Sequence, residues 1–302
     1  WHITTWGKTH ITVPLPVIVR GANGRWHLFS SSRVAHGQSY EGFYIARGGD
    51  YDGKIVERNA AGEEVRPIDL SLTKTAFALL FNSALLMLIV LGAARWYKRH
   101  PVRTSAPGGF VGLMEAAVMM IHDDLIKSCV GKDYKRFAPY LLTVFFFILI
   151  NNLMGLVPIF PGGANVTGNI AITLLLAIAT FIMTNVFGTR EYWKEIFWPE
   201  VPTWLKCPVP MMPAIEFVGI LTKPFALMIR LFANMMAGHA VILSLTCLVF
   251  VTVSMGPVVN GSMTVVSVIF CIFMNLLELL VAFIQAYVFT MLSAVFIGLA
   301  RV

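Results

Sequence analysis

Two stretches near the C-terminus carry ionisable and amide side chains among apolar residues. The first, "RLFANMMAGH", holds Arg230, Asn234 and His239, and the second, "NLLELLVAFIQAY", holds Glu278 and Gln285. An ionisable group inside a transmembrane helix costs about 2.5–3.5 kcal/mol on insertion scales, so a group retained there is a candidate functional group. A permanently charged guanidinium near groups that exchange protons favours an ion or proton pathway.

Helical geometry places one polar line along the first stretch. At about 100° and 1.5 Å per residue, Glu216 lies about 21 Å before Arg230 along the axis. The side chains within about 40° of this line are those of Glu216, Lys223, Arg230 and Asn234.

A second polar line uses the opposite side of the arginine. His239 points about 180° away from Arg230, because nine residues separate them. On the other stretch, Glu278 and Gln285 lie within about 20° of each other and about 10 Å apart. Polar side chains therefore form two lines, on opposite sides of Arg230.

The residues alone also allow a structural role for the arginine. Small residues share its face, so a neighbouring helix can approach it closely; they are Ala226, Ala233 and Ala237. Tight packing within the chain, an ion pair between Arg230 and Glu278, and a secondary transporter or ion channel that uses these two residues are the alternatives.

The composition indicates what must position these groups. Of 302 residues, 57% are hydrophobic and 13% are charged, and the mean hydropathy is +0.73, which predicts an all-α integral membrane protein. Apolar runs predict about five spanning helices, the last two of them long, at 72–94, 138–160, 168–188, 211–253 and 262–300.

Two further segments differ from these runs. Residues 1–68 contain short β-prone runs between Gly, Asn and Ser, which predicts a small extramembrane segment, and 69–302 is the expected membrane domain. In 109–128, an apolar stripe predicts either an interfacial helix or an ordinary packing helix; its members are Leu113, Ala117, Met120, Ile121 and Leu125.

The net charge of +7 indicates topology, because the cations flank the apolar runs and form no soluble basic face. Nucleic acid is therefore not an expected partner, and the bilayer is. The flanks expected on the cytoplasmic side carry Arg95, Lys98, Arg99 and Arg103 after the first run and Lys132, Lys135 and Arg136 before the second. The N-terminus is then expected outside.

These residues, in this order, resemble subunit a of F-type ATP synthases over roughly 69–302. The resemblance is carried by "LTKPFALMIRLFANMMAGH", the following "E…Q" spacing and the earlier "NNLMGLVPIFPGGANVT". Residues 1–68 resemble the exported segment added in some bacterial members, particularly the Bacteroidetes type.

The resemblance implies a non-catalytic stator subunit without cofactor or metal. Its expected partners are a rotating c-ring, peripheral-stalk b subunits and the remaining ATP synthase subunits. Two half-channels are expected to carry protons to and from the c-ring carboxylates, with Arg230 facing the ring. A bacterial inner membrane with a periplasmic N-terminus is favoured over a mitochondrial membrane.

The resemblance also assigns roles to individual side chains. Asn234, His239, Glu278 and Gln285 belong to the half-channel open to the N-terminal side, and Glu216 to the cytoplasmic one. Four residues either line an entry or only bond helices, namely Asn151, Asn152, Asn165 and Thr167. Some members carry Glu at the position of His239 and His at that of Glu278, so we expect these two residues to face each other across the two long helices as a proton-relay pair with the partners exchanged. Some members have an Asp at the position of Gly155.

Overall fold

The computed structural model describes residues 2–6, 9–12, 14–21, 23–34, 38–46, 51–58, 64–100, 108–157, 162–197 and 211–301. The chain divides into two compact units, one of Trp1–Phe81 with Ile159–Ala164 and one of Asn82–Pro158 with Asn165–Val302. Arg103, one of the expected cytoplasmic cations, lies outside the described residues.

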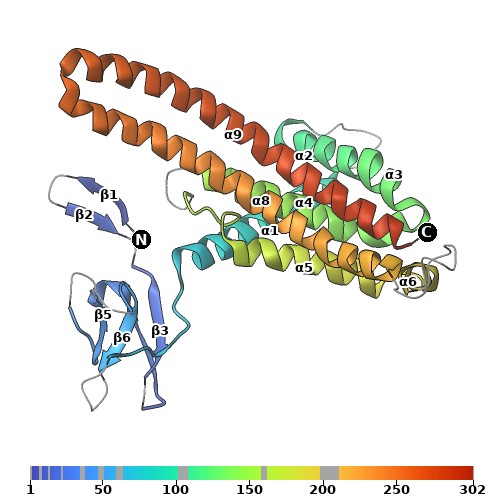
Figure 1. Cartoon of the computed structure of the whole chain (residues 1–302), viewed down its shortest axis with the longest axis horizontal. Helices are drawn as coiled ribbons and strands as arrows, with labels where there is room; N and C mark the ends of the chain where they lie inside the picture. Colours follow the sequence, from blue (N-terminus) through green and yellow to red (C-terminus); the bar gives the residue numbers. More distant parts are fainter. Residues whose placement is uncertain are drawn as a thin grey trace. The chain divides into compact units, whose positions relative to one another are not determined.

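Short antiparallel strands form the first unit (Figure 1). One three-stranded sheet has the order β4-β3-β8 and another the order β5-β6-β7, while β1 and β2 form a separate pair. The strands are β1 His2–Trp6, β2 Thr9–Thr12, β3 Pro16–Arg20, β4 Trp26–Ser30, β5 Phe43–Ile45, β6 Ile55–Arg58, β7 Glu64–Val65 and β8 Ile68–Asp69.

The alternation of side chains along β3 accounts for the small core of this unit. Val17 and Val19 point inward and are buried, because successive residues of a strand face opposite sides. Phe29 and Phe43 pack against them, with ring centroids 6.0 Å apart. The expected β-prone N-terminal segment is therefore confirmed.

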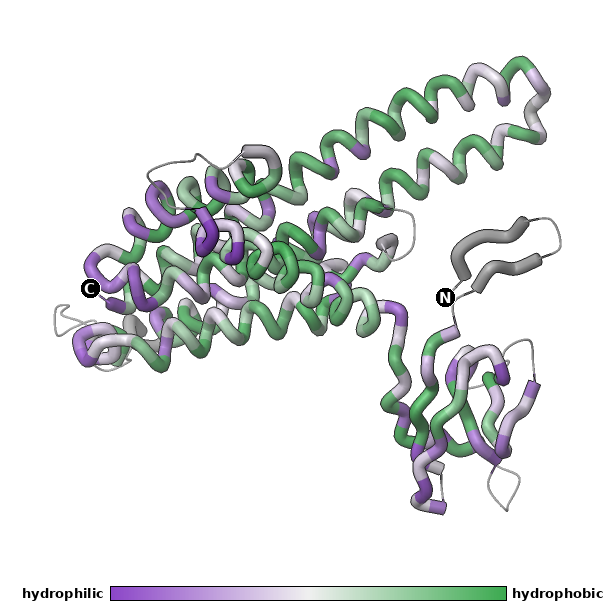
Figure 2. Tube along the Cα trace, turned by 180° about the vertical axis from the view of Figure 1, so that it is seen from behind, coloured by the Kyte–Doolittle hydropathy of each residue, from purple (hydrophilic) through white to green (hydrophobic). Residues whose placement is uncertain are grey.

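The second unit is helical, and α1 begins in the first unit and continues into the second. Among the described residues, four helical stretches are long and apolar enough to cross a membrane. They are Lys74–Arg99, Gly109–Leu156, Ile215–Ser254 and Pro257–Leu299. Figure 2 shows apolar residues along most of the two long C-terminal helices. The helices are α1 Lys74–Arg99, α2 Gly109–Met119, α3 Lys127–Val130, α4 Tyr134–Leu156, α5 Ile170–Val186, α6 Arg190–Phe197, α8 Met211–Val251 and α9 Pro257–Leu299.

The remaining expected span corresponds to α5, which is apolar but has 17 residues. At 1.5 Å per residue this is about 25 Å, at the lower end of the length that spans a bilayer. Its outward residues are large and apolar, whereas its buried face carries small and hydroxyl side chains, namely Thr173, Ala177, Thr180 and Thr184.

The predicted stripe of 109–128 is only partly buried. The helical segment continues from α2 through a π-helix, Met120–Ile126, into α3, and Ile121 and Leu125 pack in the core. Leu113 is exposed instead, because the π-helix has more residues per turn than an α-helix and shifts the phase of the stripe. Gly131, at φ +73°, allows the chain to turn from α3 into α4.

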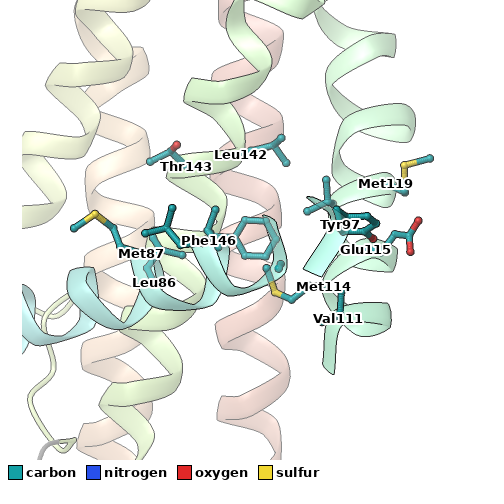
Figure 3. A pocket seen from close by; sticks show the side chains of 14 residues that line it. Leu86, Met87, Tyr97, Val111, Met114, Glu115, Met119, Leu142, Thr143 and Phe146 are labelled. Atoms are coloured by element: carbon teal, nitrogen blue, oxygen red, sulfur yellow. The ribbon is translucent and has the colours of Figure 1, made fainter. Parts of the chain in front are cut away.

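An apolar crevice of about 630 Å³ lies between α1, α2 and α4 (Figure 3). Leu86, Met114 and Phe146 are among its lining residues, with Tyr97 and Glu115 as polar members. The residues expected to transfer protons do not line this crevice. It is therefore separate from the candidate site described below.

Close backbone contact joins α9 to α3. A Cβ added to Gly298 would lie 2.1 Å from the carbonyl oxygen of Cys129, which is too short for any side chain. Gly261, also on α9, has open space at the same position. Alanine substitutions at the two glycines therefore distinguish the effect of close backbone contact on stability from the effect of helix propensity.

We expect Gly298→Ala to destabilise the protein by about 1–3 kcal/mol, because α9 must move away from the Cys129 backbone. Gly261→Ala is the matched control and should be neutral or stabilising by up to about 1 kcal/mol, since alanine favours a helix. Thermal unfolding in detergent measures both. Equal melting temperatures for the two variants would contradict the close approach.

Candidate functional site

The site is built on α8 and α9, which form a long antiparallel pair (Figure 1). A 3-10 turn, Thr252–Met255, and Gly256 at φ +103° connect them. Pro257 begins α9, where its missing N–H costs no hydrogen bond. Because the helices run in opposite directions, later residues of α8 meet earlier residues of α9.

Two amides form the first contact between these helices. Asn234 Nδ2 donates a hydrogen bond to Gln285 Oε1 over 2.7 Å. Gln285 is 3% exposed, and its Nε2 has no hydrogen-bond partner in the described part of the chain. One buried donor therefore remains available beside α8.

An imidazole and a carboxylate form the second contact. His239 Nδ1 lies 3.0 Å from Glu278 Oε1, which is within the reach required for proton transfer. Glu278 is 5% exposed, while the His239 side chain is 31% exposed. The pair thus connects a more accessible group to a buried one.

Gly238 makes room for this pair and was not recognised from the sequence. A Cβ at Gly238 would lie 2.9 Å from Glu278 Oε1 and 3.1 Å from its Cδ. The only sequence signal is a small residue directly before His239. The glycine is therefore a positioning residue for the carboxylate.

On α8, Arg230 lies about 180° from His239 but about 40° from Asn234. It is exposed, and it makes no ion pair with any residue that the structure describes, whereas Glu278 pairs with His239. The three alanines expected beside it are exposed as well, namely Ala226, Ala233 and Ala237.

A network of amides extends from α4 to the site. Asn152 Nδ2 donates to the carbonyl of Ala282, between Glu278 and Gln285 on α9, and Asn152 Oδ1 accepts from Thr167 Oγ1 over 2.7 Å. This network places Asn152 and Thr167 next to the site.

The other two expected entry residues bond locally or to α1. Asn151 Oδ1 accepts a 3.0 Å hydrogen bond from Asn82 Nδ2, and Asn165 Oδ1 accepts from the N–H of Gly168. Asn82 was missed from the sequence, although a single buried asparagine in an apolar run is itself a signal. The Asn151 bond joins α1 to α4, whereas the Asn165 bond stays within the segment before α5.

A second polar cluster lies further toward the start of α8. Burial raises the pKa of the Tyr192 phenol on α6, and the nearby Glu216 carboxylate raises this pKa further. Lys223 Nζ lies 5.6 Å from the ring centroid of Phe296 on α9, within cation–π range. Tyr192 therefore remains a neutral hydrogen-bond donor at neutral pH.

A small cavity adjoins this cluster. Its volume is about 20 Å³, enough for one water molecule, and Asn185, Tyr192 and Lys223 are among its lining residues. Asn185 Oδ1 is buried and accepts no hydrogen bond from the residues that the structure describes. The cavity thus offers a polar position between α5, α6 and α8.

Comparison with known proteins identifies the helical part of the chain. A family model described as "ATP synthase A chain" matches residues 79–298. A second model, described as a domain of unknown function (DUF8433), matches residues 1–71.

Similar proteins agree with the first model. ATP synthase subunit a of Chloroherpeton thalassium is 44% identical over 245 residues, covering 78% of this chain and 68% of that protein. ATP synthase subunit a of Chlorobium phaeobacteroides strain DSM 266 is 40% identical over 312 residues, covering 97% and 85%. The Myxococcus xanthus subunit is 41% identical over 239 residues, covering 77% and 74%. This chain belongs to the ATP synthase subunit a family.

Proposed function

We propose that this subunit is the non-catalytic stator of the ATP synthase membrane sector and guides protons to and from carboxylates on a rotating c-ring. The observation that carries the proposal is the position of Arg230. It is exposed on α8 without an ionic partner among the described residues, while polar clusters lie on either side of it along the same helix.

The half-channel open to the N-terminal side would use the contacts between α8 and α9. His239 and Glu278 can pass a proton from the more exposed imidazole to the buried carboxylate. The Asn234–Gln285 hydrogen bond continues this line toward Arg230 and leaves one donor free. These groups form a graded path from accessible to buried positions.

The cytoplasmic half-channel would use the cluster around Glu216. Tyr192, Lys223 and Asn185 provide hydrogen-bonding groups around a cavity that fits one water molecule. The two clusters lie on opposite sides of Arg230 along α8. A proton would therefore have to leave one path and enter the other by way of the ring.

Arg230 would prevent a direct shortcut between the half-channels. A fixed cation repels a proton that moves past it and attracts an ionised carboxylate on a neighbouring helix. The exposed Ala226, Ala233 and Ala237 allow such a helix to come close. We place the chain in a bacterial inner membrane, with residues 1–68 periplasmic and b subunits among its partners.

We expect Arg230→Ala to abolish proton-driven ATP synthesis without preventing assembly, because the exposed arginine makes few contacts within the chain. Ser244→Ala is the matched control on α8, since within the described residues the Ser244 hydroxyl donates a hydrogen bond only to the Ala240 carbonyl of its own helix. ATP synthesis in energised membrane vesicles gives the rates. Synthesis by the Arg230 variant at the rate of the Ser244 control would refute the proposal.

We expect the single exchanges His239→Glu and Glu278→His to slow ATP-driven proton pumping. The first places two carboxylates together, where like charges oppose joint ionisation, and the second leaves two imidazoles without an acid. The double exchange restores one of each and should recover part of the rate. A double variant no faster than the slower single variant would show that the residues are not a relay pair.

We expect Gly238→Ala to slow pumping as well, because its methyl group would displace the Glu278 carboxylate from His239. Gly219→Ala is the control, since Gly219 lies on α8 with open space at its Cβ position. Pumping rates, normalised to the amount of assembled complex, compare the two. Equal rates would remove Gly238 from the site.

A further inference from the structure

One face of the β4-β3-β8 sheet is apolar and exposed. The strand register places Leu28 opposite Ile18, and places Trp26 and Ile68 on either side of Arg20. Four side chains of this face are 55–73% exposed, namely Trp26, Leu28, Ile68 and Leu70. These four residues and Ile18 form what we call the outer face. A sheet face that meets water normally carries polar side chains, so this apolar face is unusual.

A positively charged hollow adjoins the outer face. Its volume is about 330 Å³, and its lining includes Arg20, Arg66, Glu57 and Ile68. Arg20 also lies over the Trp26 ring, 5.9 Å from its centroid. With two guanidinium groups and one carboxylate, the hollow carries a net positive charge and suits a phosphate group.

The chain connects this sheet almost directly to α1. The N–H groups of Leu70 and Leu72 donate to the carbonyls of Ile18 and Pro16, so the backbone after β8 continues along β3. Thr73 Oγ1 then accepts from the N–H of Ala76 as a helix cap, and α1 begins at Lys74. The sheet and the first turns of a membrane-spanning helix thus belong to one compact unit.

We propose that the outer face binds the phospholipid surface of the bilayer in which α1 is embedded. The exposed side chains of Trp26, Leu28, Ile68 and Leu70 would lie in the interfacial layer, where tryptophan is enriched. Arg20 and Arg66 would contact lipid phosphates. Continuity with α1 favours lipid over another protein chain, because the tether keeps the sheet at the membrane surface. This role is independent of the proton path proposed above.

The test measures membrane depth in the assembled synthase, reconstituted in vesicles of phosphatidylethanolamine and phosphatidylglycerol. Cysteines in other positions are replaced, and a nitroxide is attached to Leu28→Cys, to Ile68→Cys or to the control Lys54→Cys. Lys54 is exposed and precedes β6 of the other sheet. Accessibility to oxygen, which partitions into lipid, is compared with accessibility to a water-soluble nickel complex.

We expect the ratio of oxygen to nickel accessibility to be several-fold higher at Leu28 and Ile68 than at Lys54. Ratios equal to that of Lys54 would mean that the outer face meets water, and would overturn the proposal. Low accessibility to both reagents, with an immobilised spectrum, would mean that a protein chain covers the face, and would also overturn it.

The hollow has its own matched pair of variants. Arg66→Glu should lower the accessibility ratio of the Leu28 label toward that of Lys54, because a carboxylate repels lipid phosphate. Arg66→Lys keeps the charge and should keep the ratio high. An unchanged ratio in Arg66→Glu would rule out the phosphate contact.

Discussion

The cost of holding charged and amide groups in an apolar membrane helix governs the arrangement of α8 and α9. Glu278 and Gln285 are nearly fully buried, and each meets a polar side chain of the opposite helix. Leu231 and Met235, which lie on α8 between the directions of Asn234 and His239, are fully buried. The antiparallel pairing thus gives each buried group a polar neighbour, while both Glu278 oxygens and Gln285 Nε2 lack a hydrogen-bond partner among the described residues.

Arg230 has no ionic partner among the described residues, so its charge is not compensated within the isolated subunit. A guanidinium exposed to hydrocarbon is costly, whereas one facing a carboxylate on another helix is favourable. The alanines beside it reduce the distance at which a second helix can pack. An assembly in which an acidic helix passes this face, as in the proposed function, accounts for both the charge and the small residues.

The sequence predicted the helical membrane fold and the polar groups, and the contact that it predicted between His239 and Glu278 is present at 3.0 Å. The hydrogen bond between Asn234 and Gln285 was not predicted. Apolar runs locate helices well because the bilayer requires long hydrophobic segments. Asn234 and His239 are about 140° apart on α8, since five residues separate them, and yet both reach α9. Their side chains approach from the two edges of the interface, which depends on the position of α9 and on Gly238. The helical periodicity of one segment predicts neither the position of α9 nor the space that Gly238 leaves for Glu278.

The length of α8 sets a further requirement on the proposed mechanism. Glu216 lies about 21 Å before Arg230 and His239 about 13 Å after it along the axis, so the two polar clusters are about 35 Å apart. Protons transfer directly only between groups within hydrogen-bond distance or through an intervening water. His239 and Glu278 are within such a distance in one cluster, the cavity beside Tyr192 and Lys223 has room for one water in the other, and Arg230 lies between the clusters. In the proposed mechanism, transport would therefore depend on a carrier that moves past the arginine, which a rotating carboxylate would provide.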